Sequence, residues 1–256
     1  MSLAITQVAE VLQSGQSSLL SGLEGTAKSY FVAQLARTMG SRLVYICSEI
    51  EQAYDMARNL RGILGKERVH LLTPRNYLIQ AQGEQNQDNI ARMSFFSEIL
   101  DHPRQNGVLI MTVPSLLFAT VSPVALRKAV ISIEAGTQLD MESFPKQLIN
   151  SGYVRRPMVE NPGQFSVRGG ILDIFPLRAR EPVRLELYGD EVESLRRFSP
   201  QTQHSAGDLK SVEIWPVEET GDEDSRVWDY LPEKWPVWAD TSSNYRSHGD
   251  PICVVI

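Results

Sequence analysis

The stretch that most constrains the fold is residues 163–198, GQFSVRGGILDIFPLRAREPVRLELYGDEVESLRRF, which has the pattern of two successive β-hairpins. Gly169 and Gly170 can take the two positive φ angles of a tight hairpin turn. Gly189 and Asp190 offer a second two-residue turn after a run that alternates apolar and polar side chains. The strands are expected at 164–168, 171–175 and 183–188, with a return through Val192 and Leu195.

Side chains alternate between the two faces of a strand, so the residues of each face can be assigned. A turn at Gly169-Gly170 pairs Arg168 with Ile171 and Val167 with Leu172. The core face then comprises Phe165, Val167, Leu172, Ile174, Val183, Leu185 and Leu187. The outer face comprises Ser166, Arg168, Ile171, Asp173, Phe175, Arg184, Glu186 and Tyr188.

The outer face mixes arginines, aromatic rings and aliphatic side chains, and the cores of protein interfaces favour Arg and aromatic residues over Lys and Glu. This composition indicates a binding surface. The alternative is a solvated sheet face on which Arg168 pairs diagonally with Asp173, and Arg184 with Glu186. The pattern by itself leaves both interpretations open.

The run GQFSVRGGILDIFP, followed by RLELYGDEVESLRRF and then TQ, resembles the UvrA-binding domain shared by the excision-repair protein UvrB and the bacterial transcription-repair coupling factor, Mfd. The resemblance implies that the outer face docks onto UvrA through Arg168, Arg184 and Tyr188, and Arg155 matches a fourth position of the UvrB version. UvrB has a further arginine two residues before the Arg-Gly turn. This chain has Ser166 there, which implies a smaller contact set.

Strand and helix patterns alternate in the first part of the chain. Such alternation implies βαβ units, hence an α/β fold with a parallel sheet and helices on both faces. The nearly continuous apolar run at 108–113 is typical of a buried parallel strand. This part resembles the N-terminal lobe of a helicase motor in the UvrB and coupling-factor arrangement. Strands are expected at 18–20, 42–47, 69–72 and 108–113, and helices at 4–15, from about 28, at 50–64 and at 89–100.

A degenerate phosphate-binding loop follows the first strand. The pattern G-x-x-x-x-G-K-[ST] fits at Gly22, Lys28 and Ser29 but fails at Ala27, where the second glycine lets the backbone approach the phosphates. Glu24 adds a carboxylate that would repel a triphosphate. We therefore expect an inactive loop, with Gly22, Gly25, Lys28 and Ser29 as its remaining residues.

An acidic partner for magnesium would normally follow a buried strand, and the strands at 42–47 and 108–113 offer no Asp-Glu pair. The chain is therefore expected to bind no cofactor and not to be an enzyme. The alternative, a P-loop ATPase or helicase fragment with residual nucleotide binding, belongs to a different functional class.

The segment 73–88, TPRNYLIQAQGEQNQD, separates the two relatives. UvrB carries a long aromatic-rich hairpin there that inserts between DNA strands, whereas this segment is short and polar, with Tyr77 as its only aromatic residue. This departure favours the coupling factor over a UvrB-type damage-verification protein.

The predicted domains are a degenerate P-loop α/β lobe at 1–122, an inserted α+β UvrA-interaction domain at 123–206, and a return segment at 207–256. We interpret the chain as an N-terminal fragment, or a short relative, of the coupling factor. The resemblance implies that the full-length family protein is an ATP-dependent DNA translocase. It also implies that contacts with RNA polymerase and double-stranded DNA lie in other regions of that protein.

Composition excludes several classes. A net charge of −6 disfavours nonspecific DNA binding over the whole surface. Two cysteines in 256 residues indicate a reducing compartment, and no apolar run reaches the roughly 18 residues of a membrane helix. With no signal peptide, a cytoplasmic protein that binds no membrane is predicted.

The four histidines lack metal-ligand spacing, so neither a metal nor catalytic residues are expected. A local basic stripe stays open at Arg178, Arg180, Arg184, Arg196 and Arg197.

Overall fold

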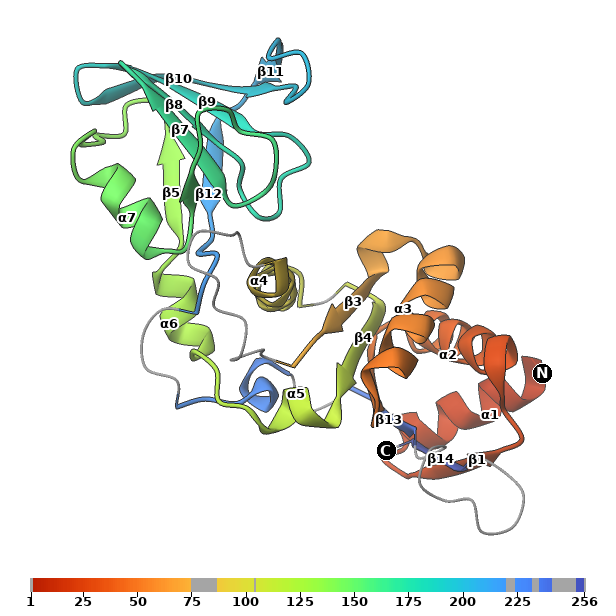
Figure 1. The fold of residues 1–256 in the computed structure, drawn as a ribbon. Helices are drawn as coiled ribbons and strands as arrows, with labels where there is room; N and C mark the ends of the chain where they lie inside the picture. The colour runs from red at the N-terminus through yellow and green to blue at the C-terminus, as the bar shows by residue number, and fades with distance from the viewer. Residues whose placement is uncertain are drawn as a thin grey trace. The chain divides into compact units, whose positions relative to one another are not determined.

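The computed structural model describes residues 2–74, 87–103, 105–219, 224–231, 235–240 and 252–255 (Figure 1). Contacts divide the chain into two compact units. Unit 1 comprises Met1–Arg75, Glu98–Ala119 and Arg226–Ile256, and unit 2 comprises Asn76–Ser97 and Thr120–Ser225. The predicted fold class is confirmed, because unit 1 contains a mostly parallel sheet with helices and unit 2 contains separate, mostly antiparallel sheets.

The sheet of unit 1 has the strand order β1-β14-β13-β2-β4-β3. Strands β13, β2, β4 and β3 run parallel, and β14 pairs antiparallel with both β13 and β1. Every residue of β4 is buried, as its continuous apolar sequence predicted. The bounds are β1 Ser18–Ser21, β2 Arg42–Cys47, β3 Val69–Leu72, β4 Gly107–Thr112, β13 Val237–Asp240 and β14 Ile252–Val255.

Helices pack against this sheet through apolar stripes. In α3 (Ile50–Leu64) the buried residues Ala53, Met56, Ala57 and Leu60 recur at helical spacing. They join a core cluster that also contains Trp238, whose ring stacks on that of Tyr45. The other helical segments with residues in unit 1 are α1 Ser2–Gln13, α2 Gly25–Met39, η1 Lys66–Arg68, α4 Gln87–Asp101, α5 Val113–Leu117 and η2 Val227–Tyr230.

Unit 2 is built on a second sheet with the strand order β11-β10-β9-β8-β7-β6. Strands β5 and β12, which lie side by side in Figure 1, form a separate antiparallel pair. Its bounds are β5 Ile131–Glu134, β6 Val154–Arg155, β7 Gln164–Arg168, β8 Ile171–Ile174, β9 Val183–Tyr188, β10 Glu191–Phe198, β11 Ser205–Asp208 and β12 Ser211–Ile214. Helices α6 (Pro123–Lys128) and α7 (Phe144–Asn150) complete the unit.

A buried ion pair ties the first part of α4 into unit 2. Glu219 accepts four hydrogen bonds: from Arg92 Nε and Nη2 at 3.1 and 2.8 Å, from Thr120 Oγ1 at 2.6 Å and from the Val121 amide at 3.1 Å. Burial on its own raises the pKa of Glu219, but the Arg92 guanidinium and these hydrogen bonds outweigh it, so the pKa lies below its ordinary value. The carboxylate thus stays charged and fully bonded in the interior.

The hairpin register predicted from the sequence is confirmed, with Arg168 opposite Ile171 and Val167 opposite Leu172. The turn itself differs from the expectation. Gly169 has φ +59°, whereas the φ angle of Gly170 is not positive. The turn therefore has a positive φ only at the first of its two central residues. Gly170 is needed for space instead, because a Cβ there would lie 2.8 Å from the Leu187 carbonyl oxygen.

Residues 207–256 were expected to return to the α/β lobe. In the structure β12 pairs with β5 of unit 2, whereas β13 and β14 belong to the sheet of unit 1. The predicted boundaries at 122/123 and 206/207 stay predictions. Residues 75–86, which hold most of the segment compared with the UvrB hairpin, lie outside the described residues.

Among the described residues, no helix is long and apolar enough to span a membrane. No group of three His, Cys, Asp or Glu side chains among those same residues is arranged to hold a metal ion.

Candidate functional site

The outer face of the unit 2 sheet brings the predicted arginines together. Cross-strand pairing sets Ser166 opposite Asp173 and Asp173 opposite Arg184, so these residues form one row across β7, β8 and β9. Arg168 lies in the adjoining row, opposite Ile171. The alternation predicted from the sequence therefore places Arg168 and Arg184 on one face.

Asp173 links the two arginines. Its carboxylate accepts from Arg168 Nη2 at 2.6 Å, and from Arg184 Nε and Nη2 at 2.7 and 2.9 Å. The Asp173 side chain is 1% exposed, against 52% for Arg168 and 23% for Arg184. The hydrogen bond to Asp173 raises the pKa of Arg184 above its ordinary value, so the guanidinium is always charged.

The pairing considered from the sequence is half right. Arg168 does pair with Asp173, but Arg184 also pairs with Asp173 rather than with Glu186. Glu186 instead accepts from Ser194 and Arg196. Strand alternation placed Asp173 on the outer face but carried no signal that it was buried there.

One end of the outer face is covered. Phe175 and Phe198 pack with Val159 in a small apolar cluster, and Phe198 also lies under the Arg184 guanidinium, 4.7 Å from ring centroid to Cζ. Ser166 is buried and donates to the Pro157 carbonyl oxygen at 3.2 Å. Ser166 is therefore covered, whereas the end of the face nearer the turns is open.

Tyr188 and Arg155 differ in their placement. Tyr188 is the last residue of β9 and lies on the same face as Arg184, four residues earlier in the strand. Its side chain is 84% exposed, more than any other large hydrophobic side chain among the described residues. Arg155 is exposed on the edge strand β6 and pairs with the core residue Phe165. Paired residues of neighbouring strands lie on the same face of a sheet, so Arg155 lies on the face opposite to that of Arg168.

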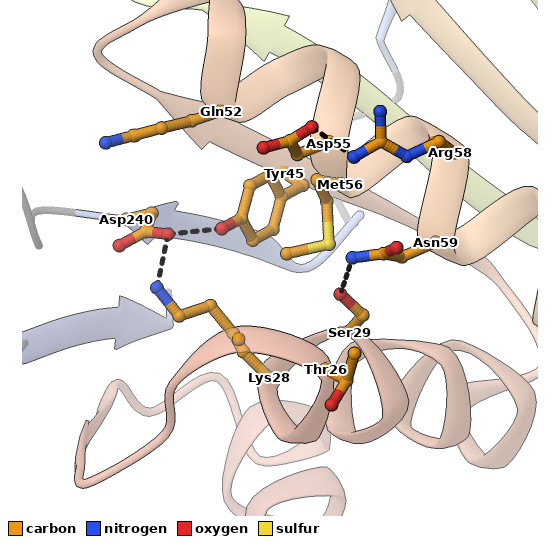
Figure 2. A pocket seen from close by; sticks show the side chains of 11 residues that line it. Thr26, Lys28, Ser29, Tyr45, Gln52, Asp55, Met56, Arg58, Asn59 and Asp240 are labelled. Atoms are coloured by element: carbon orange, nitrogen blue, oxygen red, sulfur yellow. Dashed lines mark hydrogen bonds and ion pairs between the residues drawn. The ribbon is translucent and has the colours of Figure 1, made fainter.

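The remnant of the phosphate loop lines a pocket of about 290 Å³ in unit 1. Figure 2 shows that Lys28 points to Asp240, with its Nζ 2.7 Å from Asp240 Oδ2, and that Tyr45 donates its hydroxyl hydrogen to the same oxygen. Ser29 Oγ accepts from Asn59 Nδ2 at 3.3 Å. The loop lysine and serine are therefore both engaged by protein side chains.

Asp240 was not identified from the sequence. No acidic partner was expected at the ends of the strands at 42–47 and 108–113, but Asp240 ends β13, which is the direct neighbour of β2. A strand of apolar residues followed by Asp was visible in VWAD. Only the strand order shows that this carboxylate reaches Lys28.

Comparison with known proteins identifies the unit that carries the outer face. Residues 131–219 match the family model of the UvrB interaction domain. The matched range begins at the first residue of β5 and ends at Glu219, so it contains the outer face and Arg155 and excludes the phosphate loop.

The chain as a whole also has relatives. It is 33% identical over 221 residues to a transcription-repair-coupling factor of Myxococcus xanthus, over 83% of this chain and 18% of that protein. It is 31% identical over 206 residues to the factor of Bacillus subtilis, over 80% of this chain and 17% of that protein. The similarity to UvrB and the coupling factor expected from the sequence is confirmed. The matched part covers less than a fifth of these relatives' length.

Proposed function

We propose that this chain is a catalytically silent, UvrB-like module that binds UvrA and thereby recruits nucleotide excision repair in transcription-coupled DNA repair. The observation that carries the proposal is the open end of the outer face of the UvrB interaction domain. There Arg168 and Tyr188 are exposed next to Arg184. The names of the relatives support the link to transcription and repair.

The chemistry of the outer face suits an acidic partner. An arginine can bind a carboxylate through two parallel hydrogen bonds, which a lysine ammonium cannot reproduce. Tyr188 adds a rigid aromatic side chain that loses little conformational entropy on binding. We propose Arg155 as a contact at the rim, because its position on the edge strand puts it on the other side of the sheet.

Titration calorimetry with purified UvrA tests the proposal. Arg168→Ala and Arg184→Ala should each weaken binding by roughly 2–5 kcal/mol if they lie at the centre of the interface. Arg155→Ala, at the rim, should cost about 1 kcal/mol or less and act on the association rate and its salt dependence. Arg197→Ala is the matched control, since Arg197 is exposed on β10 and pairs with the core residue Val183, on the opposite face.

Equal UvrA binding by wild type and all of these variants would contradict the docking face. Loss of UvrA binding together with an equal loss of folding would show that the arginines are structural. RNA polymerase and double-stranded DNA, partners that the resemblance implies for the full-length family protein, are not assigned to this chain.

The absence of catalysis is a separate part of the proposal. It is supported by Ala27 and Glu24 in the loop and by the ion pair of Lys28 with Asp240, which sets a carboxylate where a working loop holds phosphate. We expect no ATP turnover with or without DNA. ATP hydrolysis by the wild type that disappears in Lys28→Ala would instead establish the alternative, a P-loop ATPase.

A further inference from the structure

Asp173 is a buried charge on a face that is otherwise open at one end. Its side chain is 1% exposed, so its carboxylate cannot be a main contact for a docking protein. A buried carboxylate is costly unless it is paired and hydrogen-bonded, and here three donor nitrogens from two arginines satisfy it.

Both arginines keep donors beyond those bound to Asp173. In the described part of the chain Arg168 donates to Asp173 through Nη2 alone, and Arg184 through Nε and Nη2. The remaining nitrogens are Nε and Nη1 of Arg168 and Nη1 of Arg184. A partner carboxylate can therefore bind these donors without breaking the bonds to Asp173.

The contacts also restrict the conformations of the arginines before any partner arrives. An unrestrained arginine side chain loses much rotamer freedom when it binds, and that loss weakens affinity. The Arg184 guanidinium is held from one side by two bonds to Asp173 and from below by the Phe198 ring, at 4.7 Å. Arg168 is tied to the same carboxylate at 2.6 Å.

We propose that Asp173 is a positioning residue that holds Arg168 and Arg184 together in the geometry with which they bind carboxylate groups of UvrA. This inference rests on the proposed function of the outer face. It assigns the specificity for a partner with acidic side chains to a pair of arginines oriented by one buried carboxylate, rather than to positive charge alone.

A purely electrostatic role makes the opposite prediction. Asp173 neutralises one of the two arginine charges, so its removal would strengthen long-range attraction to an acidic partner and speed association. A positioning role predicts faster dissociation, because the arginines must then be ordered by the partner. The two rate constants separate the roles.

The experiment measures the association and dissociation rates of UvrA with the full 256-residue chain. Asp173→Asn should raise the dissociation rate by about tenfold or more, the range of coupling between directly bonded side chains. Glu186→Gln is the matched control. It removes one carboxylate from the same face, but that carboxylate bonds Ser194 and Arg196 rather than the two arginines of the proposal. We expect it to change the dissociation rate by about twofold at most.

A double-mutant cycle completes the test. If Asp173 acts through the arginines, Asp173→Asn should change the dissociation rate little when Arg168 and Arg184 are already alanine. If Asp173→Asn unfolds the chain, as circular dichroism would show, Asp173→Glu serves in its place. This variant keeps the negative charge but lengthens the side chain by one methylene, so the carboxylate no longer holds the two arginines in the same geometry and dissociation should again be faster.

Four results would overturn the inference. Equal effects of Asp173→Asn and Glu186→Gln on dissociation would show that only charge matters. A full effect of Asp173→Asn in the double-alanine background would show that it does not act through the arginines. No binding by the wild type would overturn the proposed function as well, whereas wild-type binding with unchanged Asp173→Asn kinetics would overturn this inference alone.

Discussion

The ion pair of Arg92 with Glu219 gives a sharp prediction about stability. Their side chains are 2% and 4% exposed, so Glu219→Gln removes the carboxylate charge that Arg92 contacts in the interior. Breaking a buried pair by removing one partner typically costs roughly 3–5 kcal/mol, and this loss includes the weakened bonds from Thr120 and Val121. Since whole domains are stable by only about 5–15 kcal/mol, the variant should unfold at a much lower urea concentration.

Urea unfolding followed by circular dichroism at pH 7 measures this loss. The control is Arg58→Ala, because Arg58 and Asp55 form an ion pair whose side chains are 75% and 63% exposed. An exposed pair contributes about 0–1 kcal/mol. Glu219→Gln should therefore shift the unfolding midpoint several times further than Arg58→Ala.

Acidification provides an independent check. The pKa of Glu219 is lowered in the folded state, so its stabilisation is fully present above the unfolded pKa, about 4.3, and is lost as the pH falls through the folded pKa. Once Glu219 is protonated, the wild type resembles Glu219→Gln, so the difference between them should shrink below about pH 4. A difference within about 1 kcal/mol at pH 7, or one that persists on acidification, would refute the reasoning.

Three further predictions concern single side chains. Burial, with the nearby Asp240 charge, raises the pKa of the Cys47 thiol to about 12. In a Cys253→Ser variant, which leaves Cys47 as the single thiol, the native chain should therefore react with Ellman's reagent far more slowly than the urea-unfolded chain. Gly170→Ala should lower the free energy of unfolding by roughly 1–3 kcal/mol, because its Cβ would lie 2.8 Å from a carbonyl oxygen; an unchanged urea midpoint would contradict this. Tyr188→Ala should weaken UvrA binding in calorimetry yet leave thermal stability unchanged, since this ring is 84% exposed; a lowered Tm would count against a docking role.

The sequence alone predicted the elements whose signals are local. Alternation with period 2 and the turn glycine at 169 predicted the hairpin register, and with it the common face of Arg168 and Arg184. The failed glycine position at Ala27 predicted a degenerate loop. These signals can be read because they depend on residues within a turn or a strand of one another.

The tertiary structure alone decided how charged residues far apart in the sequence meet. Asp240 reaches Lys28 because β13 lies beside β2 and the strand ends meet α2. Arg155 falls on the far side of the sheet because β6 pairs in parallel with β7 after an irregular connection, which no alternation rule spans. Asp173 is buried where Arg168 of β7 and Arg184 of β9 both donate to its carboxylate. Burial and strand order depend on packing between distant segments, and a charged side chain's role follows from them rather than from its neighbours in the chain.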